Sequence, residues 1–257
     1  MLLVSWNVNS LNVRMPRVLE LLDQYTPDVV ALQETKCAPE QFPHLELKAA
    51  GYEAVDHSRG RWAGVALLVR DDHEVAGSVI GLEGEPNPGE ARWLEAVVDG
   101  LRIASVYVIN GRTLDDPMFI DKLAFLDAMR DRVAGVDSDL VVMGDFNVAP
   151  RDDDVYAPEL FVGGTHVTDD ERSRLAAIQQ AADLSDAFLA SPQRGEHDFT
   201  WWDYRAGNFH KNLGLRIDLA LTSPAVTGRL EWVGIERDYR KGAKPSDHAP
   251  LLVRLAD

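Results

Sequence analysis

Short apolar runs separated by polar turns dominate the pattern of hydrophobic positions along this chain. Runs of this length, rich in β-branched and aromatic residues, are typical of buried β-strands. The pattern predicts strands at residues 2–6, 29–33, 65–69, 93–98, 101–108, 140–143, 217–222 and 249–255. Adjacent runs joined by a tight turn, as at Val98-Asp99-Gly100-Leu101, indicate antiparallel hairpins.

Other stretches have the spacing of helices. Asp116-Pro117 has the form of an N-cap followed by a first-turn proline. Apolar residues then recur at helical spacing before Gly135, at Phe119, Leu123, Leu126, Met129 and Val133. Thr168-Asp169-Asp170-Glu171 has the form of a capping box that opens a helix toward Asp183. A further apolar stripe is formed by Val18, Leu21, Leu22 and Tyr25. Because strands outnumber helices, and the helices fall between groups of strands, we predict a sheet-rich layered α/β fold.

The composition favours a single domain over residues 1–257, because the chain shows no Gly/Ser linker, low-complexity tract or abrupt change in composition. No apolar run approaches membrane-spanning length, and the amino terminus lacks the features of a signal peptide. We therefore expect a cytoplasmic protein with no membrane partner, and a monomer by default. Cys37 is the only cysteine, which excludes an internal disulfide and a thiolate metal cluster.

Carboxylate, amide and imidazole side chains follow the apolar runs where strands are predicted to end. They are Asn7, Glu34, Asp145, Asn147, Asp218, Asp247 and His248. Strands that bring oxygen ligands and an imidazole to one rim can build a site for a hard divalent cation. A calcium loop starting at Asp145 is excluded, because Ala149, Pro150 and Tyr156 occupy positions that such a loop reserves for other residues. The pattern predicts a metal-dependent hydrolytic site. The acidic run Asp152-Asp153-Asp154 is interpreted as a solvated loop.

Longer stretches around these residues resemble a known family. They are Gln33-Glu34-Thr35-Lys36, Phe199-Thr200-Trp201-Trp202-Asp203-Tyr204, Gly214-Leu215-Arg216-Ile217-Asp218 and Lys244-Pro245-Ser246-Asp247-His248-Ala249-Pro250. In this order they resemble the exonuclease III type of AP endonuclease, in the endonuclease/exonuclease/phosphatase superfamily. The resemblance extends from Leu3 to Leu252 and implies a four-layer αββα sandwich, in which two mostly antiparallel sheets are flanked by helices.

The resemblance also implies a role for each polar residue at the strand ends. Glu34 is expected to be the metal carboxylate, and Asp145 the general base that activates water. Asn147, His248 and the Tyr107 phenol are expected to stabilise charge on the phosphoryl oxygens, with Asp218 orienting His248. The expected catalytic residues are Tyr107, Asp145, Asn147, Asp218 and His248. The expected residues of the inner and water-mediated metal shells are Asn7, Glu34, Asp145, Asn147, Asp247 and His248.

A further set of residues is expected, by the same resemblance, to contact DNA. Asn110 follows Tyr107 in a loop where Ile109 replaces the proline usual in the family. Trp201, with Leu215 and Ile217, is expected to line a shallow apolar pocket for a sugar without its base, although hydrophobic core is an equally open interpretation of Leu215 and Ile217. The candidates for phosphate contacts are Lys36, Arg112, Arg216 and Lys244, each of which has a solvated surface charge as its alternative.

These features predict a Mg²⁺-dependent DNA phosphodiesterase of base-excision repair, with Mn²⁺ as a possible substitute. The expected partner is duplex DNA with abasic sites or blocked 3′ ends. We expect cleavage 5′ to the abasic site, 3′-to-5′ exonuclease activity and cleaning of 3′ ends. The net charge of −16 argues for modest, salt-dependent DNA affinity. The alternatives are another phosphodiesterase of the superfamily, disfavoured by the DNA-repair segments, and a non-catalytic binding module, disfavoured because no core position is lost.

Overall fold

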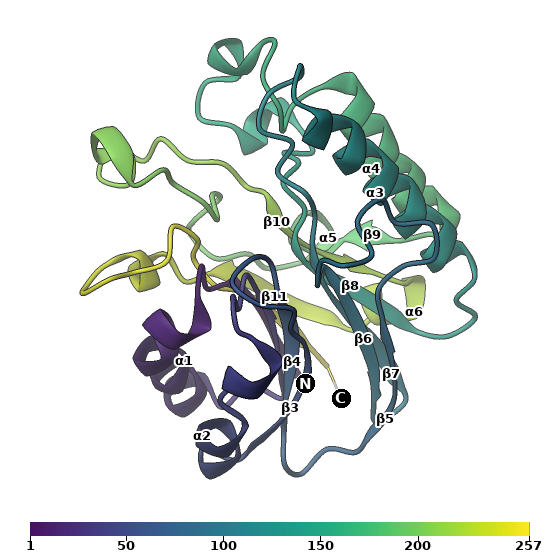
Figure 1. Cartoon of the computed structure of the whole chain (residues 1–257), viewed down its shortest axis with the longest axis vertical. Coiled ribbons are helices and arrows are strands. Elements are labelled where there is room, and N and C mark those ends of the chain that lie inside the picture. Colours follow the sequence, from purple (N-terminus) through teal and green to yellow (C-terminus); the bar gives the residue numbers. More distant parts are fainter. Residues whose placement is uncertain (257) are drawn as a thin grey trace.

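Two six-stranded sheets pack face to face, and helices cover the outer face of each (Figure 1). The computed structural model describes residues 1–256. The first sheet has the order β11 (Leu230–Ile235), β12 (Leu251–Leu255), β1 (Leu2–Asn7), β2 (Val29–Gln33), β4 (Val65–Arg70) and β3 (Tyr52–His57). The second has the order β5 (Val75–Ile80), β6 (Trp93–Val98), β7 (Leu101–Tyr107), β8 (Leu140–Asp145), β10 (Asp218–Thr222) and β9 (Ser185–Asp186).

Each sheet has one parallel pair at its centre, and its other neighbouring strands are antiparallel. The parallel pairs are β1 with β2 and β7 with β8. A helix connects the strands of each pair, namely α1 (Leu11–Tyr25) and α3 (Pro117–Ala134). This confirms the predicted four-layer sandwich of mostly antiparallel sheets. Because the two strands of a parallel pair run in the same direction, their carboxyl ends lie at the same edge of the sheet.

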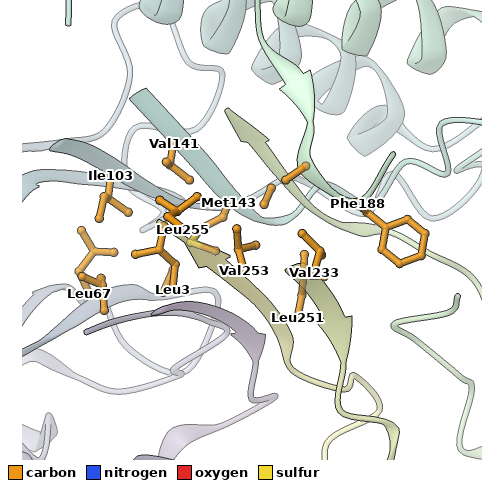
Figure 2. Close-up of a cluster of buried hydrophobic side chains, with 14 of the residues drawn as sticks. Leu3, Leu67, Ile103, Val141, Met143, Phe188, Val233, Leu251, Val253 and Leu255 are labelled. Atoms are coloured by element: carbon orange, nitrogen blue, oxygen red, sulfur yellow. The ribbon is translucent and has the colours of Figure 1, made fainter. Parts of the chain in front are cut away.

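The central strands are apolar on both faces because both of their faces are covered. Along β8, Val141 and Met143 face the opposite sheet, whereas Leu140 and Val142 face the helices. Figure 2 shows the cluster between the sheets, where Leu3, Leu67, Ile103, Val141 and Val253 meet. This alternation explains why the sequence shows continuous apolar runs and not a strict apolar–polar pattern.

The remaining helices are α2 (His44–Ala49), α4 (Asp169–Ala181), α5 (Ala187–Ala190) and α6 (Pro224–Thr227). Helices α1 and α2 lie outside the first sheet, and α3 and α4 outside the second (Figure 1). Short 3₁₀ segments occur at Pro39–Gln41, Asp152–Asp154, Pro158–Phe161, Arg205–Gly207 and Arg237–Arg240.

The predicted helix starts are confirmed. The Asp116 carboxylate accepts a hydrogen bond from the Met118 amide, and Thr168 and Glu171 form the reciprocal bonds of a capping box. One detail of the predicted α3 stripe is wrong. Leu123 is only half-buried, whereas Lys122 is fully buried on the inner face.

Strands β3, β5, β9 and β11 were not predicted, because they lie at or near sheet edges and lack continuous apolar runs. All residues of β5 except Val75 are exposed. Other predicted bounds are slightly too long: Val108, Ile217 and Ala249 lie just outside β7, β10 and β12. No helix within residues 1–256 is both long enough and apolar enough to cross a bilayer.

Candidate active site

The carboxyl ends of the two parallel strand pairs meet at one edge of the sandwich. Asn7 ends β1 and Glu34 directly follows β2, while Tyr107 ends β7 and Asp145 ends β8. In the second sheet, Asp145 is paired in register with Tyr107 on one side and with Asp218 on the other. The register of the strands therefore brings together residues that are far apart in the sequence.

Asn7 holds two of the carboxylates together. Its Nδ2 atom donates to Oε1 of Glu34 at 2.8 Å and to Oδ2 of Asp145 at 2.9 Å. Its Oδ1 atom accepts from the main-chain amide of Asn9 at 3.0 Å. Asn7 thus bridges the two carboxylates through its nitrogen, and its place in the inner or water-mediated metal shell stays a prediction.

His248 lies between Asp218 and Asp145. Its Nδ1 atom is 2.8 Å from Oδ2 of Asp218, and its Nε2 atom is 3.6 Å from Oδ2 of Asp145. All three side chains are buried. Asp218 therefore fixes the orientation of the imidazole ring and leaves Nε2 facing the centre of the site.

Burial and charge repulsion control the protonation of this cluster. Burial, opposed by His248 but reinforced by Asp218 and Glu34, raises the pKa of Asp145 to about 7. Burial disfavours the charged imidazole of His248, but Asp218 and Asp145 outweigh it and raise its pKa to about 10. Burial, together with Glu34 and Asp145, raises the pKa of Tyr107 well above 10, so the phenol keeps its proton.

The residues present fit a divalent cation. Glu34, Asp145 and His248 each offer a ligand atom, and these atoms lie within 4.8 Å of one another. Within residues 1–256, Oδ1 of Asp218 is buried and has no hydrogen-bond partner. Burial is the main cause of the raised pKa of Asp145, and the negative charges of Asp218 and Glu34 add to it; a cation would offset those charges. The carboxylate oxygens suit a hard cation.

Asn147 lies two residues after Asp145, and hydrogen bonds engage its main-chain amide and both polar atoms of its side chain. Its main-chain amide donates to Oδ1 of Asp145 at 2.9 Å, and its Nδ2 donates to the carbonyl of Val108 at 2.9 Å. Its Oδ1 accepts from Nδ2 of Asn110 at 3.0 Å. The φ angles of Asn147 and Glu34 are +50° and +51°, a left-handed conformation that is uncommon for residues other than glycine and that often occurs at functional sites.

Asp247 and Lys36 lie beside the cluster. Asp247 accepts from Nε1 of Trp201 at 3.1 Å and from Nδ2 of Asn9 at 3.0 Å, so each of its two carboxylate oxygens has a partner. Nζ of Lys36 lies 2.7 Å from Oε2 of Glu34. The position of Lys36 is compatible with the expected phosphate contact, and Asp247 holds the half-buried Trp201 beside the site.

The prediction that Arg216 contacts phosphate is wrong. Its guanidinium is fully buried and bonds to Asp154 at 2.8 and 3.0 Å and to Asp186 at 2.7 Å. The interpretation of the acidic run as a solvated loop holds for Asp152 and Asp153, which are exposed, but is wrong for Asp154, which is buried and serves as a partner of Arg216. A guanidinium with two buried carboxylate partners stabilises the fold and has no free surface for DNA.

Leu215 and Ile217 belong to the hydrophobic core and not to an open pocket. Both are buried with Ala149 and Val155 in a small cluster beneath Trp201. Trp201 and Phe199, which is also part of the expected pocket segment, are half-buried and retain accessible surface. The other candidates for DNA contact, Asn110, Arg112 and Lys244, are exposed.

Sequence reasoning missed two groups of residues around the site. The first is Trp62, which is 73% exposed in a loop with Arg59 and Arg61. The main chain of this loop bonds to the segment after Glu34, since Lys36 N donates to Ala63 O at 3.0 Å. The available signal was an isolated tryptophan directly after two closely spaced arginines.

The second group is buried under Asn147. It consists of Lys122, Thr165, His166 and Glu171, which bond to one another or to the main chain of Asn147. Burial and the charge of Lys122 lower the pKa of His166 to about 4, so its neutral Nδ1–H donates to Asn147 O at 2.5 Å. The signal was a lysine on the inner face of a predicted helix.

Comparisons with known proteins agree with this fold and site. The model of the endonuclease/exonuclease/phosphatase family matches residues 4–248, so the chain belongs to that family. Exodeoxyribonuclease III of Haemophilus influenzae is 29% identical, over 96% of this chain and 97% of the relative.

Solved structures provide closer matches within the family. Two structures of NExo from Neisseria, described as a 3′-5′ exonuclease and as a 3′ phosphatase bound to product DNA hairpin, are 36% and 35% identical. Both match with a TM-score of 0.92 over 100% of each chain. An AP endonuclease from Archaeoglobus fulgidus is 28% identical, with a TM-score of 0.92 over 99% of each chain. The chain is similar to the exonuclease III-type enzymes over its whole length.

Proposed function

We propose that this protein is a metal-dependent DNA phosphodiesterase of base-excision repair, which cuts 5′ to abasic sites and also removes nucleotides and blocking groups from 3′ ends. The observation that carries the proposal is the buried cluster of Glu34, Asp145 and His248, with Asp218 behind the imidazole. The full-length similarity to exodeoxyribonuclease III, NExo and an AP endonuclease supports DNA as the substrate.

Asp145 has the properties of the general base. It is a buried carboxylate at the centre of the site that can accept a proton from water, and Asn7 and the Asn147 amide hold its two oxygens in place. His248 has the properties of a charged donor, since its pKa of about 10 keeps Nε2 protonated at neutral pH. Water attack at phosphorus and donation to the phosphoryl oxygens are thus assigned to different side chains.

Two neutral donors complete the proposed site. The Tyr107 phenol keeps its proton, and the Arg92 guanidinium lies 4.8 Å from the centre of its ring. The Asn147 amide nitrogen uses one hydrogen on Val108 O, which leaves the other for a phosphoryl oxygen. Both donors are positioned before substrate arrives, which lowers the cost of organising them during the reaction.

Glu34 and Asp145 are the residues proposed to hold the cation, with His248 beside them. A cation bound here would polarise the phosphoryl group and offset its charge. We propose Mg²⁺, with Mn²⁺ as a substitute, because the donors are mainly carboxylate oxygens. We also propose that residues 1–257 act as one domain, since the core between the sheets includes Leu3, Ile103 and Val253 from distant parts of the chain. A cytoplasmic location and a monomeric state remain predictions.

The test uses three labelled duplexes, of which one carries a tetrahydrofuran abasic analogue, one a 3′-phosphate, and one is undamaged. Each is incubated with Mg²⁺ or with EDTA, and Asp145→Asn protein is the control for contaminating nucleases. Mg²⁺-dependent cutting 5′ to the analogue is the expected result. Release of 3′-phosphate without cutting at the analogue would remove the endonuclease part of the proposal. No reaction on any duplex would overturn the phosphodiesterase assignment.

A further inference from the structure

We propose that Lys122 is a positioning residue of the active site, which fixes the main chain of Asn147 and Asn110 so that their two side-chain amides lie in place for catalysis. The inference rests on the proposed function and identifies a residue from the helical layer on which that function depends. The side chain of Lys122 is fully buried, so it does not reach the surface. Its hydrogen bonds go to Asn147, Asn110, Thr165 and Glu171, and not to the carboxylate cluster.

The ammonium group of Lys122 joins the two loops that carry the amides. Nζ donates to Asn147 O at 2.6 Å and to Asn110 O at 3.3 Å. It also donates to Oγ1 of Thr165 at 3.1 Å and forms an ion pair with Glu171. One buried charge therefore fixes the carbonyls of both residues whose side chains bond to each other above it.

Glu171 keeps this charge in place from α4. Its Oε1 accepts from Thr165 Oγ1 at 2.7 Å and from His166 N at 2.8 Å, and its Oε2 accepts from Thr168 N at 3.0 Å. Glu171 thus closes the capping box of α4 and also pairs with Lys122. Because Lys122 lies on α3, the start of α4 is coupled through α3 to the active-site loops.

The local main chain explains why such support is needed. Asn147 has a φ of +50° and Gly111, directly after Asn110, has a φ of +84°. A Cβ atom at Gly111 would lie 3.1 Å from Cδ of Lys122, so the loop passes tightly over the lysine stem. Left-handed residues persist only where their surroundings hold them, and Lys122 donates a charge-assisted hydrogen bond to the carbonyl of Asn147.

A purely stabilising role gives a different expectation. Burying an ion pair costs desolvation, and a neutral replacement of both partners is often as stable as the pair. If Lys122 only stabilises the fold, replacing both charged residues should leave both the stability and the activity unchanged. If Lys122 positions the amides, replacing both charged residues leaves the fold intact but lowers the reaction rate. Small displacements of catalytic groups can lower the rate by about 100-fold.

The experiment compares wild type with the double variant Lys122→Met/Glu171→Gln. Glutamine can still close the capping box, so the helix start is kept. The matched control is Arg132→Met, which removes a partner of the buried Glu95 at the opposite end of the second sheet, where Arg102 still pairs with that carboxylate. Melting temperature, and kcat and KM on the abasic-analogue and 3′-phosphate duplexes, are measured for each protein.

We expect the double variant to melt near the wild-type temperature, with kcat about 100-fold lower, KM changed by only a few fold, and the control unchanged. Wild-type kcat in the double variant overturns the proposal, as does a kcat loss that Arg132→Met reproduces. The side-chain amide NMR signals of Asn147 and Asn110 are a second readout that needs no substrate. They should shift in the double variant and not in the control, and unchanged signals overturn the positioning role even if wild type cuts neither duplex.

Discussion

Nδ1 of His248 lies 2.8 Å from Oδ2 of Asp218, and the other oxygen of this buried carboxylate has no hydrogen-bond partner within residues 1–256. The pair joins the two sheets at the active-site edge, because His248 precedes β12 and Asp218 begins β10. One contact thus orients the imidazole and controls its charge, and both effects can be measured.

Asp218→Asn should lower kcat about 10- to 100-fold, the usual effect of losing a carboxylate that orients a histidine in a metal site. Asp218 helps to raise the pKa of His248 to about 10, so its loss lowers that pKa. The protonated donor is then lost at a lower pH, and the alkaline limb of the kcat–pH profile moves toward neutrality. An unchanged alkaline limb would show that Asp218 does not control the charge of His248.

Asp145→Asn should abolish nicking while leaving DNA binding nearly intact, because an amide cannot accept the proton from water but has almost the same shape. Binding is measured by fluorescence anisotropy in EDTA and nicking in Mg²⁺. Burial is the main cause of the raised pKa of Asp145, so replacing this buried carboxylate by a neutral amide should not harm folding. Full nicking activity in this variant would rule out Asp145 as the base.

Much of the site could be predicted because polar residues stand at the ends of apolar runs, and because the resemblance to a known family implied a role for each of them. Asn7, Glu34, Asp145 and Asp218 all flank strands, and strand register brings them together. The partners of Arg216 could not be predicted, because Asp154 and Asp186 lie on distant segments and a linear pattern does not report burial. Edge strands such as β5 could not be predicted either, because an exposed strand needs no continuous apolar run.

Arg216→Met should lower the free energy of unfolding by about 3–5 kcal/mol, because it leaves Asp154 and Asp186 buried without their shared partner. The kcat of the folded fraction should stay near wild type. Arg112→Ala is the matched comparison, since the Arg112 side chain is 66% exposed and only weakly paired with Asp116. Arg112→Ala should weaken DNA binding without changing the urea midpoint. If Arg216→Met instead weakened DNA binding and left the urea midpoint unchanged, Arg216 would be a DNA contact after all.

Trp62→Ala should weaken binding of duplex DNA roughly 10-fold, in line with the 1–3 kcal/mol of a base or sugar stacked on an aromatic ring. The loop of Trp62 is bonded to the main chain of the segment after Glu34, so this exposed ring belongs to a loop attached to the active-site edge. Leu45→Ala, at an equally exposed apolar residue of α2, is the control. Equal affinity of the two variants in an anisotropy titration would show that Trp62 does not contact DNA.

His73 clamps the sandwich at the end opposite the active site. Its Nε2 lies 2.8 Å from Oδ1 of Asp28, which precedes β2, and its Nδ1 lies 2.6 Å from Oδ2 of Asp99, in the β6–β7 turn. Burial opposes its charge, but the hydrogen bonds to Asp99 and Asp28 outweigh that effect and raise the pKa of His73 above 6.5. Its stabilising contribution is therefore complete below pH 6.5 and is lost as pH rises through the higher pKa of the folded state.

His73→Gln should lower the free energy of unfolding by roughly 1–3 kcal/mol at pH 6, the range for hydrogen bonds between charged groups. The loss should be smaller at pH 9.5, where wild-type His73 is itself less charged. Urea unfolding at the two pH values measures both, and His44→Gln, at a more exposed histidine paired with Asp56, is the control. Because the clamp is remote from Asp145, kcat should not change. A loss of stability that is equal at both pH values would mean that His73 acts by packing and not by charge.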